Sequence, residues 1–504
     1  MISLLYVNEK KVESKLEDSL FTDLKIGKLL EHIFDNYSEA DEVIEILKEI
    51  PDKESLQYRQ EVFNDILNDK NNKLETLYYE LVDVVGRFSS LKGATENIKR
   101  KVFYIFYSYY YYVLLEDVKK TFLEINVASK CFKNIIKEID SILEDETIIT
   151  KREQITRIYE NIVNHLFFNL EYHDGAPYYQ VTFEDKENLE DKLINIAKGL
   201  NVNFVKQPKS VAKHEINPYF LREISLNDAK IYNELNNYYE ANKNDCVDLT
   251  ELVKEAKYYL SLKTIFNRVH NYGIPICKVN INDNNENTII DAYDISLMIS
   301  NIDIVPNDYY ASDNEYIQFV LGVNSGGKTC YLRSVAINYV FFMTCGWMFS
   351  KSATLYPVKY IHTHFPNEEN YAVGEGRLRD EIKRLDKIKS TFSSECIAFL
   401  NETFSSTSEE KACVLTHELL DSIGLSKAKV MYVTHQYKIF EELHDPRITF
   451  YTPVVIEGEN NIRTHKIKKV EKKLLSYVGD ILNKYGLTKK QLLEKKANKG
   501  DNNE

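Results

Sequence analysis

One short motif limits the folds open to this chain more than any other feature: residues 322–329 read GVNSGGKT and satisfy the pattern G-x-x-x-x-G-K-[ST]. A β-rich run, YIQFVL at 316–321, precedes the motif, and an apolar stretch at 330–349, long enough for a buried helix, follows it. In the order strand, glycine loop and helix, this pattern forms a phosphate-binding loop. The sequence therefore predicts an α/β domain that binds a nucleotide. The alternative is a glycine-rich turn that matches by coincidence.

The residues of this loop have separate expected roles. Glycines lack a Cβ, so the backbone N–H groups can approach a polyphosphate at the positive end of the following helix. Lys328 is expected to meet the β- and γ-phosphates of ATP, and the hydroxyl of Thr329 to bind Mg²⁺. The loop residues expected to bind the nucleotide are Gly322, Asn324, Ser325, Gly326, Gly327, Lys328 and Thr329.

Composition narrows the class of protein and its compartment. With 504 residues, of which 44% are hydrophobic, the chain is long enough for roughly three domains with real cores. The net charge of −13 argues against a surface that binds nucleic acid everywhere, although a local basic groove is compatible with it. Seven scattered cysteines without a C-x-x-C pair indicate neither a disulfide framework nor a zinc site. With no signal-peptide pattern and no apolar run of the ~20 residues that cross a bilayer, we expect a cytoplasmic protein without a membrane partner.

The first half of the chain has the spacing of helices. From Ser19 to about Leu170 apolar residues recur every three or four positions, and Pro51 is the one proline. The run FYIFYSYYYY at 103–112 is apolar or aromatic on every face, which predicts a helix packed on several sides or a buried hairpin arm. The periodicity weakens near 171–218, where short β-like pieces predict a small irregular insert, and then resumes to about His270.

Two apolar strands downstream of the loop end in polar residues. In CIAFLNE (396–402), Asn401 stands where an Asp is normally expected; its amide oxygen can accept from a Mg²⁺-bound water but brings no charge, so metal affinity is expected to be lower. Glu402 is the candidate that polarises the attacking water. The strand at 430–434 ends in His435, which we expect near the γ-phosphate. Taken alone, His435 would be a hydrogen-bonded histidine at a strand end; its order after Glu402 favours the catalytic site.

A glycine-rich segment lies between the loop and these strands. Gly374 and Gly376 precede a helix expected over 378–389, whose N-terminus is suited to a phosphate brought by a second molecule. The alternative is an ordinary helix start with glycine near its N-cap. Phosphate loop, glycine-rich segment, strand ending in Asn-Glu and strand ending in His follow the order found in ABC-type ATPases, in which ATP is sandwiched between two subunits.

Four segments together resemble the ATPase domain of the DNA mismatch-repair MutS family: IVPND (304–308), GVNSGGKTCYLRSVA, LNETFSSTS (400–408) and VTHQY (433–437). Upstream, DSLFTDLKIGKLLEHI (18–33) and LQYRQEVFNDI (56–66) resemble the core and lever helices of MutS-related proteins, so the likeness covers most of the chain. The chain departs from the family at three positions. Ile304 occupies the place of an aromatic residue that stacks on adenine, Gly376 that of the signature Ser, and Asn401 that of an Asp.

The resemblance implies an α+β multidomain fold. We expect a long α-helical core/lever-like body at 1–270, an α/β ABC-type P-loop ATPase domain at 271–470 and a short C-terminal helical tail at 471–504, a candidate dimerisation element. The implied activity is slow hydrolysis of MgATP in a homodimeric, nucleotide-switched clamp on double-stranded or branched DNA. No residues precede the helical body to form a mismatch-reading domain, so we expect phosphate contacts without mismatch readout. The basic residues considered for these contacts are Lys99, Arg100, Lys101, Lys206, Lys209 and Lys213.

Two other functions stay open on the sequence. The chain is alternatively a soluble ABC-type ATPase that serves another machine, but the Asn-Gly-Gly loop and the absence of long coiled-coil heptads count against this. It is alternatively a nucleotide-binding interaction module with little hydrolysis, a reading that Asn401 favours and that Glu402 and His435 oppose.

Overall fold

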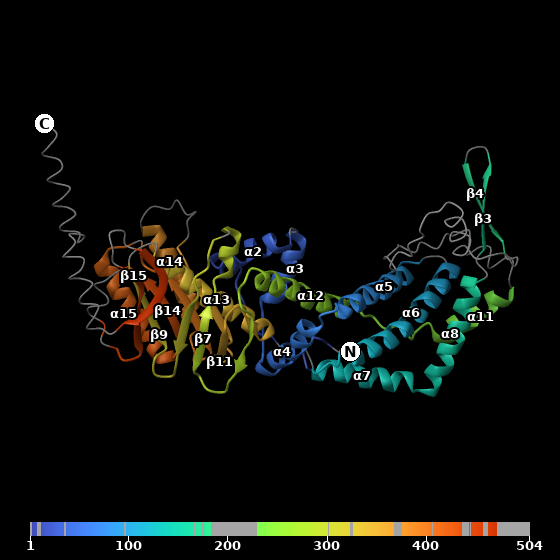
Figure 1. Ribbon diagram of the computed structural model, residues 1–504, viewed down its shortest axis with the longest axis horizontal. Coiled ribbons are helices and arrows are strands. Elements are labelled where there is room, and N and C mark those ends of the chain that lie inside the picture. Colours follow the sequence, from blue (N-terminus) through green and yellow to red (C-terminus); the bar gives the residue numbers. More distant parts are fainter. Residues whose placement is uncertain are drawn as a thin grey trace. The chain divides into compact units, whose positions relative to one another are not determined.

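A computed structural model describes most of the chain (Figure 1). The described residues are 3–7, 12–34, 37–94, 97–164, 167–173, 176–182, 229–300, 302–322, 326–366, 375–405, 407–435, 443, 445–456 and 462–470. The chain forms two compact units: residues 1–8 with 61–260, and residues 9–60 with 261–504. The boundary expected from sequence lay at 270–271; in the structure, an N-terminal segment instead joins the second unit. The predicted tail at 471–504 lies outside the described residues.

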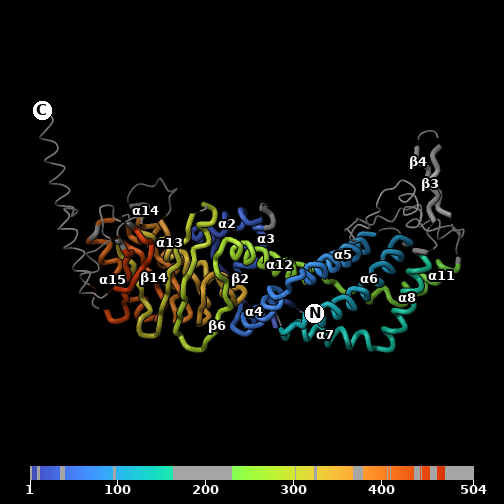
Figure 2. The backbone as a smooth tube through the Cα atoms, viewed as in Figure 1, coloured from blue at the N-terminus to red at the C-terminus, as the bar shows by residue number. Residues whose placement is uncertain are grey.

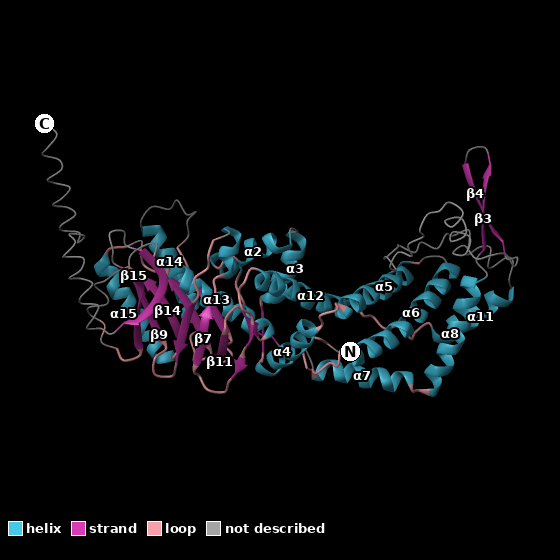
Figure 3. Cartoon of the chain, in the orientation of Figure 1, coloured by secondary structure: helices cyan, strands magenta, loops and turns pink. Residues whose placement is uncertain are grey.

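The first unit is mainly helical, as Figure 3 shows. Two helices, α4 (Lys53–Asn68) and α12 (Thr250–Asn271), contain the boundaries between the units. The other helices in the described residues of this unit are α5 (Lys73–Gly93), α6 (Asn97–Glu124), α7 (Lys130–Leu143), α8 (Glu146–Asn164) and α11 (Ala229–Asn242). In the hydrophobic core of this unit, aliphatic residues of α5 and α8 pack with aromatic residues of α6 and α11. The long helices expected from the apolar spacing are therefore present in this region.

The tyrosine-rich run at 103–112 lies within α6 and is a helix rather than a hairpin arm. Tyr104 and Tyr107 are buried, and the Tyr109 ring stacks on Tyr159 of α8 with a centroid separation of 3.8 Å. Neighbouring Lys101, considered above as a phosphate contact, is 4% exposed and donates to Asn236, so burial removes it from that role. Lys206, Lys209 and Lys213 lie outside the described residues.

A hairpin follows α8, although the apolar spacing predicts helix to about Leu170. Strand β3 (Phe167–His173) pairs antiparallel with β4 (Ala176–Thr182), and the sequence between them is Asp174-Gly175. Asp-Gly between two β-rich runs favours a two-residue hairpin turn, and this local signal overrides the weak helical spacing. The rest of the predicted insert, from 183 onward, lies outside the described residues.

The second unit is built on a six-stranded sheet in the order β12-β13-β14-β9-β15-β16. The first five strands are parallel and β16 is antiparallel to β15. The strands are β9 (Ile317–Leu321), β12 (Tyr360–His364), β13 (Cys396–Asn401), β14 (Lys429–Thr434), β15 (Ile448–Ile456) and β16 (Ile462–Val470). Strands β9, β13 and β14 are buried along their whole length, which explains their nearly continuous apolar sequences.

Helices and a second sheet complete this unit. The helices are α13 (Lys328–Cys345), α14 (Glu375–Lys389), α15 (Glu409–Ser426) and the 3-10 helix η1 (Ile295–Ser300). A four-stranded sheet has the order β6 (Asn280–Ile281), β11 (Ser352–Leu355), β7 (Asn287–Ala292) and β8 (Asn307–Ala311), and β5 (Cys277–Lys278) pairs with β10 (Trp347–Met348). None of the helices in the described residues is long and apolar enough to cross a membrane.

The N-terminal segment packs on these elements, and Figure 2 shows its blue helices beside the yellow part of the chain. It contains β1 (Val12–Lys15), α1 (Asp18–Asp23), α2 (Ile26–Phe34), α3 (Tyr37–Leu47) and β2 (Glu49–Pro51). Helix α1 contacts β12, α2 contacts η1, and α3 and β2 contact α13. Residues from the beginning of the chain therefore form part of the support of the central helix α13.

Helix α13 ends four residues earlier than the apolar stretch predicted. Gly346 has φ +73°, and its N–H caps the helix by donating to Phe342 O. A Cβ on Gly346 would lie 2.5 Å from Gln60 Cβ, and the Gln60 amide donates to Gly346 O over 2.7 Å. A left-handed glycine is a common helix end, and here a side chain from α4 also occupies the space.

Candidate functional site

The register of the six-stranded sheet brings the ends of three strands to one edge. Asn401 is aligned with Val433, and Thr434 with Leu321. Because β9, β13 and β14 are parallel, the residues that follow them emerge at the same carboxyl edge of the sheet. The phosphate-loop motif, the Asn401-Glu402 pair and His435 are therefore neighbours in space, although the sequence separates them.

The two ends of the glycine loop have backbone conformations that suit glycine. Gly322 has φ +143°, and a Cβ there would lie 2.7 Å from Pro453 Cδ; Gly327 has φ +91° and is the N-cap of α13. Residues with a Cβ rarely adopt these angles. Between them, Gly326 is described and buried, whereas Asn324 and Ser325 lie outside the described residues.

Lys328, in the first turn of α13, points back into the loop. Its Nζ donates to Gly322 O over 2.8 Å, and only 4% of the residue is exposed. Burial lowers the pKa of the Lys328 ammonium, while the nearby Glu402 carboxylate raises it. The lysine is thus held inside the loop, where it contacts a neutral backbone oxygen.

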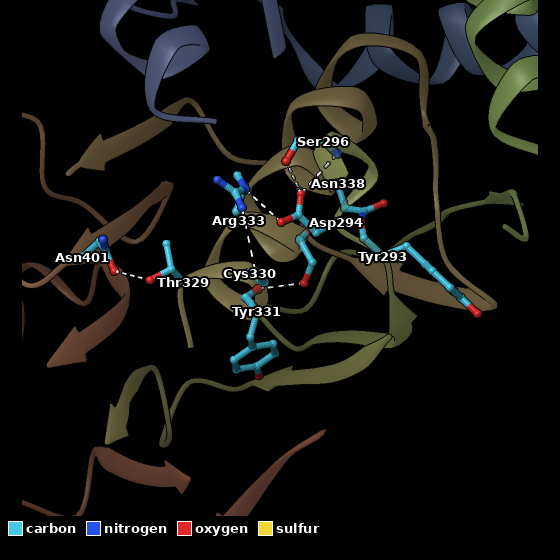
Figure 4. A network of polar contacts seen from close by, with 10 residues as sticks. Tyr293, Asp294, Ser296, Thr329, Cys330, Tyr331, Arg333, Asn338 and Asn401 are labelled. Atoms are coloured by element: carbon cyan, nitrogen blue, oxygen red, sulfur yellow. Dashed lines mark hydrogen bonds and ion pairs between the residues drawn. The ribbon is translucent and has the colours of Figure 1, made fainter. Parts of the chain in front are cut away.

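Thr329 and Asn401 connect α13 to the end of β13, as the close view in Figure 4 shows. Thr329 Oγ1 donates to Asn401 Oδ1 over 3.2 Å. Asn401 is 7% exposed, so the contact is largely shielded from water. A hydroxyl and an amide oxygen, both suitable ligands or water acceptors for Mg²⁺, therefore meet at the start of the helix.

Glu402 and His435 form the more exposed part of this edge. Glu402 Oε1 and His435 Nδ1 are 3.7 Å apart, and their side chains are 28% and 45% exposed. The φ angle of Glu402 is +50°, an uncommon value for a residue with a Cβ, and its N–H donates to Val433 O over 2.8 Å. Both side chains therefore retain access to solvent beside a constrained backbone.

The structure does not bring every predicted residue to this edge. Gly374 lies outside the described residues, and Gly376 lies inside the first turn of α14, because this helix begins at Glu375 rather than at Leu378. Ile304 is half-buried in the segment before β8. This segment is tied to β16, since Lys466 donates to Pro306 O and the Asn307 amide donates to His465 O.

One residue at the loop was missed by sequence reasoning. His465 of β16 has φ +56°, and a Cβ on Gly327 would lie 3.4 Å from both His465 Cβ and Nδ1. The imidazole is therefore beside the N-cap of α13. No local motif indicates this position, because the contact joins parts of the chain more than a hundred residues apart.

A buried ion pair supports α13 just after the loop (Figure 4). Arg333 Nε donates to Asp294 Oδ2 over 2.8 Å, and the two side chains are only 7% and 3% exposed. Asp294 Oδ1 also accepts from the Ser296 hydroxyl over 2.6 Å, and Arg333 Nη2 lies 3.8 Å from Cys330 Sγ. The beginning of α13 is therefore anchored to η1 by a satisfied polar network.

Among the described residues, no three His, Cys, Asp or Glu side chains gather in a way that could hold a metal ion. A magnesium ion held by one hydroxyl, one amide, water and phosphate oxygens fits the residues present, because Mg²⁺ is commonly bound through substrate phosphates.

Comparison with known proteins gives consistent matches. Residues 318–488 match the family described as MutS domain V. The chain is 22% identical over 227 residues to the DNA mismatch repair protein MutS of Desulfitobacterium hafniense, an alignment covering 44% of this chain and 26% of that protein. It is 27% identical over 139 residues to the DNA mismatch repair protein MSH3 of Arabidopsis thaliana, covering 27% of this chain and 13% of that protein. The chain thus spans about a quarter or less of the length of these relatives.

Proposed function

From the match of residues 318–488 to MutS domain V, we propose that the chain is a MutS-family protein that binds and slowly hydrolyses ATP with Mg²⁺. In this proposal it acts on DNA as a homodimeric, nucleotide-switched clamp without mismatch-specific readout. The observation that carries the proposal is the meeting of Lys328, Thr329, Asn401, Glu402 and His435 at one edge of a parallel sheet. Ligands of open α/β sheets bind at such a carboxyl edge.

The residues present fit a magnesium nucleotide. Gly322 and Gly327 let the backbone turn tightly at the N-terminus of α13, where N–H groups favour anions. Lys328 can exchange the carbonyl oxygen of Gly322 for a charged phosphate oxygen, which is the stronger acceptor. Thr329 and Asn401 would hold Mg²⁺ directly or through water, and bound Mg²⁺ would neutralise phosphate charge.

Glu402 and His435 suit hydrolysis. In this proposal the Glu402 carboxylate accepts a hydrogen bond from the attacking water and polarises it, while His435, 3.7 Å away, senses or stabilises the γ-phosphate. Asn401 brings no charge to the metal, so turnover is proposed to be slow. The layout of an ABC-type ATPase, with Gly374 and Gly376 serving the nucleotide of a second subunit, is part of the same proposal.

The proposed switch links ATP to DNA through dimer closure. Two subunits that close round two nucleotides would move the helices attached to the ATPase domain, and this movement would open or tighten a clamp. The similar proteins are named for DNA mismatch repair, which supports DNA as the partner. The expected cytoplasmic location belongs to the same proposal.

A second candidate function is nucleotide binding with little hydrolysis, and Asn401 is the observation that favours it. A third, a soluble ABC-type ATPase that serves another machine, would bind no DNA. One experiment separates all three: ATP binding and turnover are measured with and without duplex, mismatched, branched and single-stranded DNA. The proposal expects turnover that DNA changes. Binding without turnover selects the second candidate, and turnover indifferent to all four DNAs selects the third.

A further inference from the structure

The turn that carries Glu402 is strained on both sides of Thr403. The φ angle is +50° at Glu402 and +65° at Phe404, and both residues have a Cβ. Positive φ is sterically unfavourable for such residues and persists only where the surrounding structure fixes it. Thr403 lies between these two residues, so its contacts are the ones that can hold the turn and, with it, Glu402.

Thr403 is held by two buried side chains from neighbouring strands. Its Oγ1 lies 3.1 Å from Nδ1 of His364, the last residue of β12. Its carbonyl oxygen accepts a hydrogen bond of 3.0 Å from the Tyr432 hydroxyl of β14. Thr403 itself is 1% exposed, so water cannot replace these partners.

The two partners are themselves fixed. His364 is 2% exposed and is hydrogen-bonded to the backbone of Glu381 in α14. Tyr432 is 1% exposed, and its hydroxyl lies 3.5 Å from Thr416 Oγ1 of α15. Strands β12 and β14, which lie on either side of β13, thus each contribute one hydrogen-bonding side chain to Thr403.

We propose that Thr403 is a positioning residue for Glu402: its hydrogen bonds with His364 and Tyr432 keep the turn in the strained conformation that directs the Glu402 carboxylate. This inference rests on the proposed function only for its effect on turnover. Thr403 itself is buried and acts through Glu402. A general base has to lie within hydrogen-bond reach of the water it activates, so a relaxed turn would weaken catalysis without removing a phosphate contact.

Thr403→Val tests the inference because it keeps the shape of the side chain and removes the hydroxyl. We expect kcat for ATP to fall by about tenfold to a hundredfold, with KM and ATP affinity within twofold of the parent. Thr403→Ser, which restores the hydroxyl, should recover most of the rate, and Tyr432→Phe should lower kcat in the same way. Thr449→Val is the matched control, because it removes a buried hydroxyl at the beginning of β15. This variant should have the kcat of the parent.

A crystal structure of Thr403→Val without nucleotide provides a readout that does not depend on turnover. The inference expects φ of Glu402 to leave the positive region or the 3.7 Å separation from His435 to change. An unchanged turn overturns it, as does a parent-like kcat, or a fall in kcat matched by an equal loss of ATP affinity. A parent chain that neither binds nor hydrolyses ATP would defeat the proposed function, while the crystal structure would still decide the role of Thr403.

Discussion

The hydroxyl of Thr329 donates to the side-chain oxygen of Asn401 over 3.2 Å, so the two residues expected to hold Mg²⁺ are already paired by a neutral hydrogen bond. An Asp at 401 would offer a charged acceptor to the same hydroxyl and to a metal-bound water. Asn and Asp have nearly the same shape, so charge is what would distinguish them at this position.

Asn401→Asp is expected to strengthen Mg²⁺ binding, because ligand charge raises affinity for a hard cation. We expect the Mg²⁺ concentration for half-maximal hydrolysis to fall at least threefold, about 0.7 kcal/mol. A Mg²⁺ titration of ATP turnover measures this. Asn314→Asp, which adds the same charge in an exposed turn before β9, is the control. An unchanged or raised midpoint in Asn401→Asp would contradict the prediction.

Glu402→Gln is expected to bind ATP and to hydrolyse it about a hundredfold more slowly or worse, because the amide cannot accept a proton from water. Nucleotide-bound dimers should then accumulate, which light scattering after gel filtration would detect. Glu410→Gln, an exposed change in the first turn of α15, is the control. Equal turnover in Glu402→Gln and the parent would exclude Glu402 as the catalytic base.

Lys328→Ala is expected to lose measurable ATP binding while the protein stays folded, since the ammonium is directed at the loop rather than at a carboxylate in the core. Isothermal titration with ATP and circular dichroism would measure the two properties. Lys351→Ala removes an exposed lysine of the same unit and should bind ATP normally. A folded Lys328→Ala protein with parental affinity would remove this residue from the site.

His364 predicts a pH-dependent stability. Burial, with a smaller contribution from Arg384, lowers the pKa of its imidazole from 6.5 to about 4. The unfolded chain therefore binds the proton at higher pH than the folded chain, so stability is lost as pH falls from about 6.5 toward 4. Between pH 7.5 and pH 5 this contributes about 2 kcal/mol. Urea unfolding at pH 7.5 and pH 5 measures the free energy of unfolding of the parent and of His364→Gln. The difference between the two pH values should be smaller in the variant. An equal difference in both proteins would contradict a lowered pKa of His364.

DNA binding is expected to depend on salt and not on a mispair, because the proposed contacts are between basic side chains and phosphates, which carry no base identity. Replacing Lys99 and Arg100 of α6 by Gln should lower affinity and reduce the salt slope by about 2. Lys133 and Lys137 of α7, replaced in the same way, form the control pair. A tenfold preference for a mispaired duplex, about 1.4 kcal/mol, would overturn the expectation.

Sequence reasoning found the parts of the site that have local signals. The phosphate-loop motif and the apolar strands ending at Asn401 and Thr434 are visible because glycine spacing and buried parallel strands leave patterns in a short window. Their meeting at one sheet edge follows from parallel pairing. The catalytic and metal-binding roles of these residues stay predictions.

Most of the features that sequence reasoning missed depend on contacts between distant parts of the chain. His465 reaches Gly327, and Thr403 reaches His364, only after the sheet has formed. The grouping of residues 9–60 with the second unit also has no local signal, because helical spacing is the same whichever unit a helix joins. The hairpin at 167–182 is partly visible in the sequence, but most of its first strand falls in the stretch whose apolar spacing predicts helix.

The N-terminal segment of the second unit also determines the order in which the protein can be completed during synthesis. Ser14 donates to Lys359 O, 345 positions later, and Asp23 accepts from Arg384, 361 positions later. At about 5–20 residues per second, a ribosome needs roughly 20 to 70 s to make these partners. Helix α2, whose buried residues are Ile26, Leu29, Leu30 and Ile33, likewise lacks its partner η1 until Ile295–Ser300 have been made. A nascent chain stalled before Ile295 would thus expose a surface that the finished protein hides.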